Sequence, residues 1–295
     1  MYKKKIKIAI IGNCQVRPIS QMLSLLNPNI EVISIAIVHL MVSENREEYW
    51  RFFNRADLII TQLIADTYPC EFVQTNFLKK YFDYKIIKIV NLYYLGYTPD
   101  LMYIRNTTQG TLKSPLGEYH NKTFFEAFKK GLSIQDAMQN YNNYDYNKEQ
   151  YSGIAEKSLE ELKKREYYTD IQIADFIEER LAKERLFFVF NHPSKKLLLE
   201  LAKKILLVCG IKIERTFNIK NYKEPLDKII VPINIYEKEK LYNSCDNTID
   251  FQGVECNIAS NNKVIVSSFR KYTLLEIVEK FYEVYENTYQ ENLYE

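Results

Sequence analysis

A short apolar run near the start of the chain breaks at a glycine, and this break constrains the fold more than any other feature. Residues 8–15 read IAIIGNCQ, and after Gly12 apolar residues recur at helical spacing as Ile19, Met22, Leu23 and Leu26. We predict a buried strand, a sharp turn and then a helix, with Pro18 in the first helical turn, where proline is tolerated. Cys14 then lies at the carboxyl end of a strand and beside the N-terminus of a helix.

The predicted position of Cys14 suits a reactive thiol. At a helix N-terminus, unpaired backbone N–H groups and the positive end of the helix dipole favour the thiolate, which is the nucleophilic form of cysteine. The same N–H groups can hold an oxyanion, and Asn13 is a further candidate donor. The alternative is a structural cysteine that fills a tight turn as a small apolar residue.

Short apolar runs then alternate with helical patterns. We predict strands and helices in turn at residues 31–38, 44–54, 57–61, 69–82 and 85–90. This alternation indicates βαβ units, which form a parallel sheet with helices on both faces. The predicted fold class is therefore α/β, with a short central parallel sheet.

The middle of the chain changes character. Residues 96–120 contain several prolines and glycines and are predicted as a loop, and residues 121–184 are predicted as a large helical insertion. The apolar run at residues 186–190 (LFFVF) is predicted as a fifth strand, which a helix at 195–208 follows.

The domain organisation follows from this pattern. We predict one α/β domain over residues 1–210 and a C-terminal α+β extension over residues 211–295 that packs on the same domain. Within the extension, residues 228–236 are predicted as an edge strand, because Pro232 cannot donate a ladder hydrogen bond. Residues 273–289 are predicted as a closing amphipathic helix.

Polar residues follow the predicted strand ends. After the five strands come, in turn, Cys14, His39, Gln62, Asn91 and His192. Because ligands of open α/β sheets bind beyond the carboxyl ends of the strands, we expect these residues to line one edge of the sheet.

A cysteine nucleophile also needs a base within hydrogen-bond reach. The chain has three histidines, His39, His120 and His192, and each is a candidate base. Each also has a structural alternative; residues 191–194 (NHPS), for example, suit the start of a helix.

Composition excludes several classes of function. The chain of 295 residues carries a net charge of +2, which gives no general nucleic-acid or membrane-surface signal. Its five cysteines form no CxxC pair, so we expect no metal site and no disulfide framework. The basic start leads directly into the first strand, so we expect no signal peptide, no membrane span and a cytoplasmic protein. Neither GxGxxG nor GxxxxGK[ST] occurs, so the usual dinucleotide and P-loop assignments fail.

Five groups of residues occur in the order seen in a known family. They are Gly12-Asn13-Cys14-Gln15 with Arg17-Pro18, Gln62 with Asp66, Asn91-Leu92-Tyr93 with Gly96 to Asp100, Pro115 to His120, and Phe190-Asn191-His192-Pro193. Together they resemble the WcbI-type polysaccharide biosynthesis proteins, and the resemblance covers residues 5–210. The Gly-Asn-Cys-Gln stretch is also similar in placement to the nucleophile turn of SGNH esterases, with cysteine where those have serine.

The resemblance implies a Rossmann-like or SGNH-like sheet with a helical insertion, and an acetyltransferase that uses coenzyme A. The expected reaction is O-acetyl transfer from acetyl-CoA to a capsular or other surface polysaccharide or its precursor. Two alternatives stay open: an SGNH-like esterase or thioesterase with a cysteine nucleophile, and a non-catalytic glycan-assembly protein.

The expected site residues fall into two sets. The candidate catalytic residues are Cys14, His192, Asn13, His120 and His39. The residues expected to contact coenzyme A are Gly12, Gln15, Arg17, Gln62 and Asn191.

Overall fold

A four-stranded parallel sheet has the order β2-β1-β3-β4 in the computed structural model, which describes residues 5–106, 110–242, 248–260, 262–288 and 293–294. The strands are β1 (Ile6–Gly12), β2 (Ile30–Ile37), β3 (Leu58–Gln62) and β4 (Ile86–Ile89). They confirm the first four predicted strands. Because all the pairings are parallel, the four carboxyl ends meet at one edge of the sheet.

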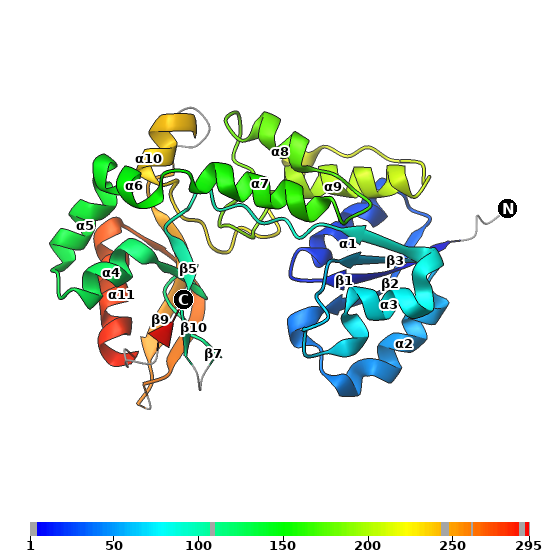
Figure 1. The fold of residues 1–295 in the computed structure, drawn as a ribbon, viewed down its shortest axis with the longest axis horizontal. Coiled ribbons are helices and arrows are strands. Elements are labelled where there is room, and N and C mark those ends of the chain that lie inside the picture. Colours follow the sequence, from blue (N-terminus) through cyan, green and yellow to red (C-terminus); the bar gives the residue numbers. More distant parts are fainter. Residues whose placement is uncertain (1–4, 107–109, 243–247, 261, 289–292, 295) are drawn as a thin grey trace. The chain divides into compact units, whose positions relative to one another are not determined.

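Helices cover both faces of this sheet (Figure 1). One side carries α1 (Val16–Leu26) and α9 (Lys195–Val208), and the other carries α2 (Arg46–Arg55) and α3 (Thr75–Phe82). The apolar stripe of α1 is fully buried, as its helical spacing predicts. On the opposite side, Ala9 and Ile11 of β1 share a core with Phe53 and Leu78. The short 3₁₀ turns of this region are η1 (Val38–Leu40), η2 (Ser43–Asn45), η3 (Glu71–Val73), η4 (Asp83–Lys85) and η5 (Ile219–Asn221).

The chain forms two compact units, each made from separate stretches of sequence. Unit 1 contains the parallel sheet and consists of Met1–Tyr93, Glu160–Glu179 and Pro193–Pro225. Unit 2 consists of Tyr94–Leu159, Arg180–His192 and Leu226–Glu295. These units do not follow the boundary at residue 210 that the sequence suggests, since both units use residues from either side of it.

The predicted helical insertion consists of α4 (Lys122–Lys129), α5 (Ile134–Asn142), α6 (Tyr144–Tyr151), α7 (Ile154–Glu166) and α8 (Ala174–Arg180). Later in the chain come α10 (Ile235–Glu237), the π-helical turn η6 (Lys238–Tyr242) and α11 (Leu274–Thr288), the predicted closing helix. The strands of unit 2 are β5 (Leu101–Tyr103), β6 (Arg105–Asn106), β7 (Gly110–Thr111), β8 (Tyr119–Asn121), β9 (Phe251–Ile258), β10 (Val264–Tyr272) and β11 (Leu293–Tyr294).

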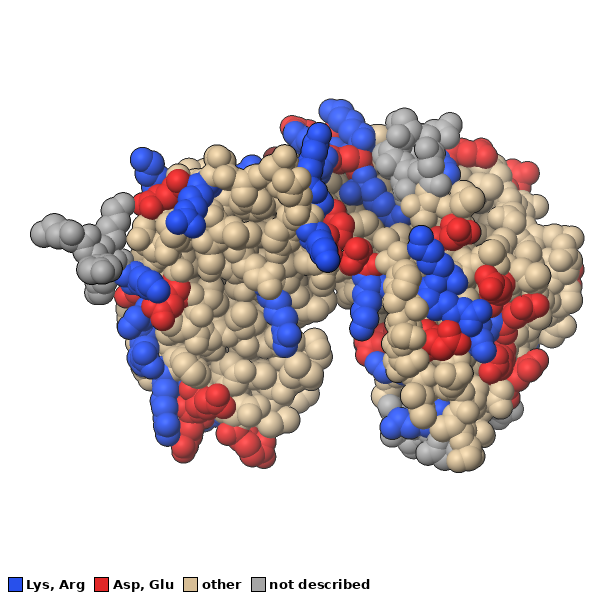
Figure 2. All heavy atoms as spheres, turned by 180° about the vertical axis from the view of Figure 1, so that it is seen from behind, with Lys and Arg blue, Asp and Glu red and all other residues tan. Residues whose placement is uncertain are grey.

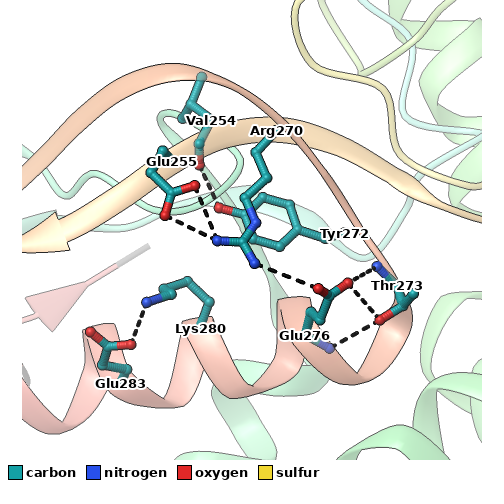
Figure 3. Close-up of polar contacts among 8 residues, drawn as sticks. All are labelled: Val254, Glu255, Arg270, Tyr272, Thr273, Glu276, Lys280 and Glu283. Atoms are coloured by element: carbon teal, nitrogen blue, oxygen red, sulfur yellow. Dashed lines mark hydrogen bonds and ion pairs between the residues drawn. The ribbon is translucent and has the colours of Figure 1, made fainter.

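Polar contacts connect the β9–β10 hairpin of unit 2 with the start of α11 (Figure 3). The Arg270 guanidinium donates to both carboxylate oxygens of Glu255 at 3.0 and 3.1 Å, and it lies 3.5 Å from Glu276. Glu276 also accepts hydrogen bonds from the backbone and the hydroxyl of Thr273, both at 2.8 Å. Thr273 and Glu276 therefore form the reciprocal cap that starts α11.

The predicted fifth strand at residues 186–190 is wrong. Among the described residues this segment forms no strand. The Arg185 side chain donates to two of its carbonyls, and the Tyr94 N–H donates to a third, that of Phe190, at 2.7 Å. The guanidinium donates to the carbonyl oxygens of Phe187 at 2.9 Å, Phe188 at 3.0 Å and Val231 at 2.5 Å. An apolar run is therefore buried here without a sheet, which periodicity alone does not reveal. His192 consequently does not follow a strand of the parallel sheet.

Two further expectations for unit 2 need correction. The predicted edge strand at residues 228–236 is only an isolated bridge, between Ile230 and Gln252. The predicted loop at residues 96–120 contains the short strands β5 to β8. The β9–β10 hairpin was not predicted.

Figure 2 shows both basic and acidic side chains on this face, with broad areas of uncharged residues between them. This agrees with 40 basic and 38 acidic residues in the sequence. In the part of the chain that the structure describes, no helix combines the length and the apolar character needed to cross a membrane.

Candidate functional site

Cys14 lies in the turn between β1 and α1, as the sequence predicts. The strand ends at Gly12 and the helix starts at Val16. The Val16 N–H donates to the Asn13 carbonyl at 3.2 Å and closes the turn. The Cys14 side chain is half-buried. The thiol is therefore next to the first helical turn, where the helix dipole favours negative charge.

The side chain of Gln15 connects this turn to two neighbouring loops of unit 1. It is completely buried, and its amide donates to the Leu92 carbonyl at 2.7 Å. Its carbonyl oxygen accepts from Gln62 Nε2 at 3.0 Å and from the Leu92 N–H at 3.1 Å. The segments that follow β1, β3 and β4 thus meet at Gln15, so the shape of the Cys14 turn depends on this side chain.

Asn13 and Gln62 complete the network. Gln62 Oε1 accepts from the Asn13 N–H at 2.8 Å, and Asn13 Oδ1 accepts from the Gln15 N–H at 3.0 Å. Asn13 Nδ2 donates to Asn91 Oδ1 at 2.9 Å. A side chain at Gly12 would not fit, since its Cβ would lie 2.5 Å from Gln62 Oε1.

The expectation that polar residues gather at one edge of the sheet holds for Cys14, His39, Gln62 and Asn91. Cys14, His39 and Asn91 follow the carboxyl ends of β1, β2 and β4, and Gln62 is the last residue of β3. His39 is exposed in η1, directly after β2. Arg17 is exposed in the first turn of α1.

Arg165 of α7 is a residue at this edge that the sequence did not suggest. Its guanidinium donates to the Tyr93 carbonyl at 3.1 Å and lies 5.5 Å from the centre of the Tyr93 ring. The group is half-buried, Nε has no hydrogen-bond partner among the described residues, and burial lowers the pKa of Arg165. In the sequence it follows two lysines in a charged helix, a pattern that normally indicates a solvated face.

In unit 2, His192 belongs to a cluster of aromatic and amide groups. Its Nε2 lies 3.1 Å from the Tyr119 hydroxyl, which donates to Asn191 Oδ1 at 2.6 Å. Asn191 Nδ2 in turn donates to the Tyr103 hydroxyl at 3.0 Å. Asn191 and His192 are therefore neighbours in one hydrogen-bonded chain.

The environment of His192 keeps its ring neutral at pH 7. Burial lowers the pKa of His192 to about 4, although the backbone of Leu226 and the charge of Glu118 act in the opposite direction. A neutral imidazole has a lone pair that can accept a proton, but a pKa of about 4 makes His192 a weak base at pH 7.

His120 has a different environment, in the core of unit 2. It is completely buried; Nδ1 lies 3.1 Å from the Tyr285 hydroxyl and Nε2 lies 3.2 Å from the Leu112 carbonyl. Burial lowers the pKa of His120 to about 4. Because both nitrogens of His120 have protein partners and the ring is not accessible to water, this arrangement favours a structural role for His120.

Comparison with known proteins gives the family. The family model described as "Polysaccharide biosynthesis enzyme WcbI" matches residues 7–214, which is more than half of the chain. This chain belongs to the WcbI family. The match includes the Cys14 turn, Gln62, Asn91 and the Asn191–His192 pair. A search of the curated proteins finds no match.

A solved WcbI structure has the same fold. It matches with a TM-score of 0.76 and 17% sequence identity, over 98% of this chain and 92% of that chain. That protein is described as a novel polysaccharide biosynthesis enzyme, in its native form without a disulfide bond between coenzyme A and its own Cys14. The likeness extends beyond the span of the family model, so the WcbI fold includes the C-terminal part of this chain.

The pH dependence of Cys14 labelling tests whether its thiol is activated by the helix N-terminus in this WcbI protein. Placed before a helix N-terminus, its thiol should have a pKa below the usual value of about 8.5. Cys209 is a matched control, because it is also half-buried but lies at the C-terminus of α9, where burial raises its pKa to about 11. Iodoacetamide labelling against pH, in chains that retain only Cys14 or only Cys209, should separate the two thiols by more than two pH units. A Cys14 inflection above the usual value would favour a packing role.

Proposed function

We propose that this WcbI protein is a coenzyme A-dependent O-acetyltransferase that acts on a capsular or other surface polysaccharide or its precursor. Family membership supports the polysaccharide context, and the solved WcbI protein, whose description names coenzyme A, supports the donor. The observation that carries the proposal is the Cys14 turn. Its thiol lies just before the N-terminus of α1, and hydrogen bonds of the buried Gln15 and Gln62 amides hold the turn in place.

The residues of the turn fit a thioester donor. Anionic groups bind well at a helix N-terminus, and Arg17 and Arg165 of unit 1 supply positive charge. An oxyanion at the thioester carbonyl needs hydrogen-bond donors. Because the backbone N–H groups of Asn13 and Gln15 already have partners, and Asn13 Nδ2 gives only one of its two hydrogens to Asn91, we propose the second N–H of the Asn13 side chain as a donor.

Two routes lead to the same product. In the direct route, His192 takes the proton of a sugar hydroxyl, the oxygen attacks the acetyl carbonyl, and coenzyme A leaves as its thiolate. In the two-step route, the Cys14 thiolate attacks the acetyl carbonyl and coenzyme A leaves as its thiolate. The sugar hydroxyl then loses its proton to the base and attacks the acetyl carbonyl of the Cys14 thioester, and the Cys14 thiolate leaves. The alternatives differ in the acceptor: an esterase or thioesterase would use water, and a glycan-assembly protein would transfer nothing.

Titration calorimetry with coenzyme A tests the proposal most directly. We expect saturable binding that Cys14→Ala retains and that Arg17→Ala weakens, since Arg17 is proposed to contact phosphate. With acetyl-CoA present, thiol release beyond one equivalent per chain should require an added polysaccharide acceptor. The absence of binding at millimolar coenzyme A would reject the proposal, and thiol release at the same rate without any sugar would favour the hydrolase.

A further inference from the structure

The Tyr119 hydroxyl lies between the Asn191 amide and the His192 ring. Its oxygen is 2.6 Å from Asn191 Oδ1 and 3.1 Å from His192 Nε2. All three residues belong to unit 2, and Tyr119 begins β8. A hydroxyl has one hydrogen to donate and two lone pairs, so its two contacts cannot both be donations.

The neighbouring contacts decide where the hydroxyl hydrogen goes. Asn191 Nδ2 donates to the Tyr103 hydroxyl at 3.0 Å, which turns Asn191 Oδ1 toward Tyr119 as an acceptor. The short contact at 2.6 Å is then the donation from Tyr119 to Asn191. A lone pair of the Tyr119 oxygen therefore faces His192 Nε2, so Nε2 carries the hydrogen of the neutral ring and donates it to Tyr119. The lone pair of the neutral ring is then on Nδ1, which has no hydrogen-bond partner among the described residues.

Packing holds Tyr119 in this position. Its ring stacks on Tyr103 at 5.4 Å and meets Phe190 edge-on at 5.1 Å. Its backbone pairs with Tyr103 in the β5–β8 ladder, and its carbonyl accepts from the Ser114 hydroxyl at 2.5 Å. The side chain is only 5% exposed. The hydroxyl thus sits on a rigid element, as the partner of a functional imidazole should.

We propose that Tyr119 is the positioning residue of His192: its oxygen accepts from Nε2, holds the imidazole in place and fixes the tautomer in which Nδ1 is the nitrogen that takes up a proton. The proposal rests on the proposed function, in which His192 is the base. Glu118, which precedes Tyr119, is the charged group that favours the protonated ring in the same direction.

Tyr119→Phe removes the hydroxyl and keeps the ring that packs on Tyr103. We expect kcat for acetyl transfer to fall about 10- to 100-fold with KM for acetyl-CoA unchanged, by analogy with the loss that follows when a metal-bound imidazole loses its hydrogen-bond partner. We also expect the titration of His192, followed by nitrogen NMR of its ring and by the acid limb of the rate profile, to move to lower pH. The sign follows because the variant loses an acceptor that stabilises the protonated ring.

Tyr285→Phe is the matched control. It removes a hydroxyl at the same distance, 3.1 Å, from a ring nitrogen of His120, which has no proposed role in the reaction. It should move the His120 signals and leave both kcat and the His192 titration unchanged. An equal loss of kcat in the two variants would mean that general damage, and not positioning, explains the effect of Tyr119→Phe.

The outcomes separate this inference from the proposed function. If His192→Ala abolishes transfer but Tyr119→Phe retains the wild-type kcat and His192 titration, the positioning role is overturned alone. If His192→Ala is fully active, the proposed base is wrong, and an unmoved His192 titration in Tyr119→Phe would overturn the contact as well. If Tyr119→Phe does not fold, Tyr103→Phe takes its place, because it removes the hydroxyl to which the Asn191 amide donates. This variant must lower kcat and shift the His192 titration in the same direction by a smaller amount. A wild-type kcat and a wild-type His192 titration in Tyr103→Phe would overturn the proposal.

Discussion

Replacing His192 with alanine should lower the rate of acetyl transfer by about 10²–10⁴-fold and leave coenzyme A affinity nearly unchanged. The reason is the neutral ring within the Tyr119–Asn191 cluster, which is suited to accept a proton. The measurement is thiol release at saturating acetyl-CoA and polysaccharide, with affinity taken from calorimetry. The contrasting variant is Arg17→Ala, which should weaken binding more than it slows the bound complex.

A wild-type rate in His192→Ala at saturating substrates would contradict the assignment. Residues 191–194 would then be only the start of α9, and His39 would become the next candidate base. His39 is exposed and follows β2 in the same unit as Cys14, whereas both nitrogens of the enclosed His120 have protein partners.

Replacing Gln15 with alanine should destabilise unit 1 by roughly 3 kcal/mol, because it leaves buried partners unmet at about 1–3 kcal/mol each. The partners are Gln62 Nε2 and both backbone groups of Leu92. Urea unfolding followed by the fluorescence of Trp50 measures this directly, since Trp50 is the only tryptophan and lies in α2 of unit 1. Coenzyme A binding should weaken in parallel as the Cys14 turn loosens.

Gln74→Ala is the control for this prediction. Gln74 also donates two hydrogen bonds, to the carbonyls of Asp66 and Tyr68 at 2.9 and 2.8 Å, but Asp66 is exposed and Tyr68 only half-buried. Water can replace it there, so the loss should be less than about 1 kcal/mol. An equal loss of unfolding free energy in the two variants would show that the buried hydrogen bonds of Gln15 stabilise unit 1 no more than the exposed ones of Gln74.

The sequence predicts the parallel sheet well because each of its strands is a short apolar run between helical patterns. That rule fails at residues 186–190, where the Arg185 side chain and single backbone contacts bond to the carbonyls and no strand ladder forms. It also fails to find β9, which contains Gly253. A glycine interrupts the strand pattern, yet here it is required, because the Pro115 carbonyl would collide with any Cβ at that position.

The candidate site is predictable only in part, for a similar reason. The rule that polar residues occur at strand ends is enough to find Cys14, Gln62 and Asn91, since the position of each is determined by the strand pattern of its own segment. The difference between His120 and His192 depends on contacts made by distant segments, above all by Tyr285 of α11. No local pattern in the sequence carries that information. The same holds for Tyr119, whose contacts with residues 191 and 192 depend on the fold of unit 2.

The way unit 2 is assembled along the chain has a consequence for its biosynthesis. The family match ends at residue 214, yet Phe124 and Phe125 of α4 pack on Phe281 and Tyr285 of α11. The His120–Tyr285 contact joins positions 165 residues apart. Contacts this distant form slowly, so during translation the apolar face of α4 stays uncovered until α11 has left the ribosome. A fragment that ends with the family match would remain in that aggregation-prone state, and a nascent chain of this protein passes through it on every round of synthesis.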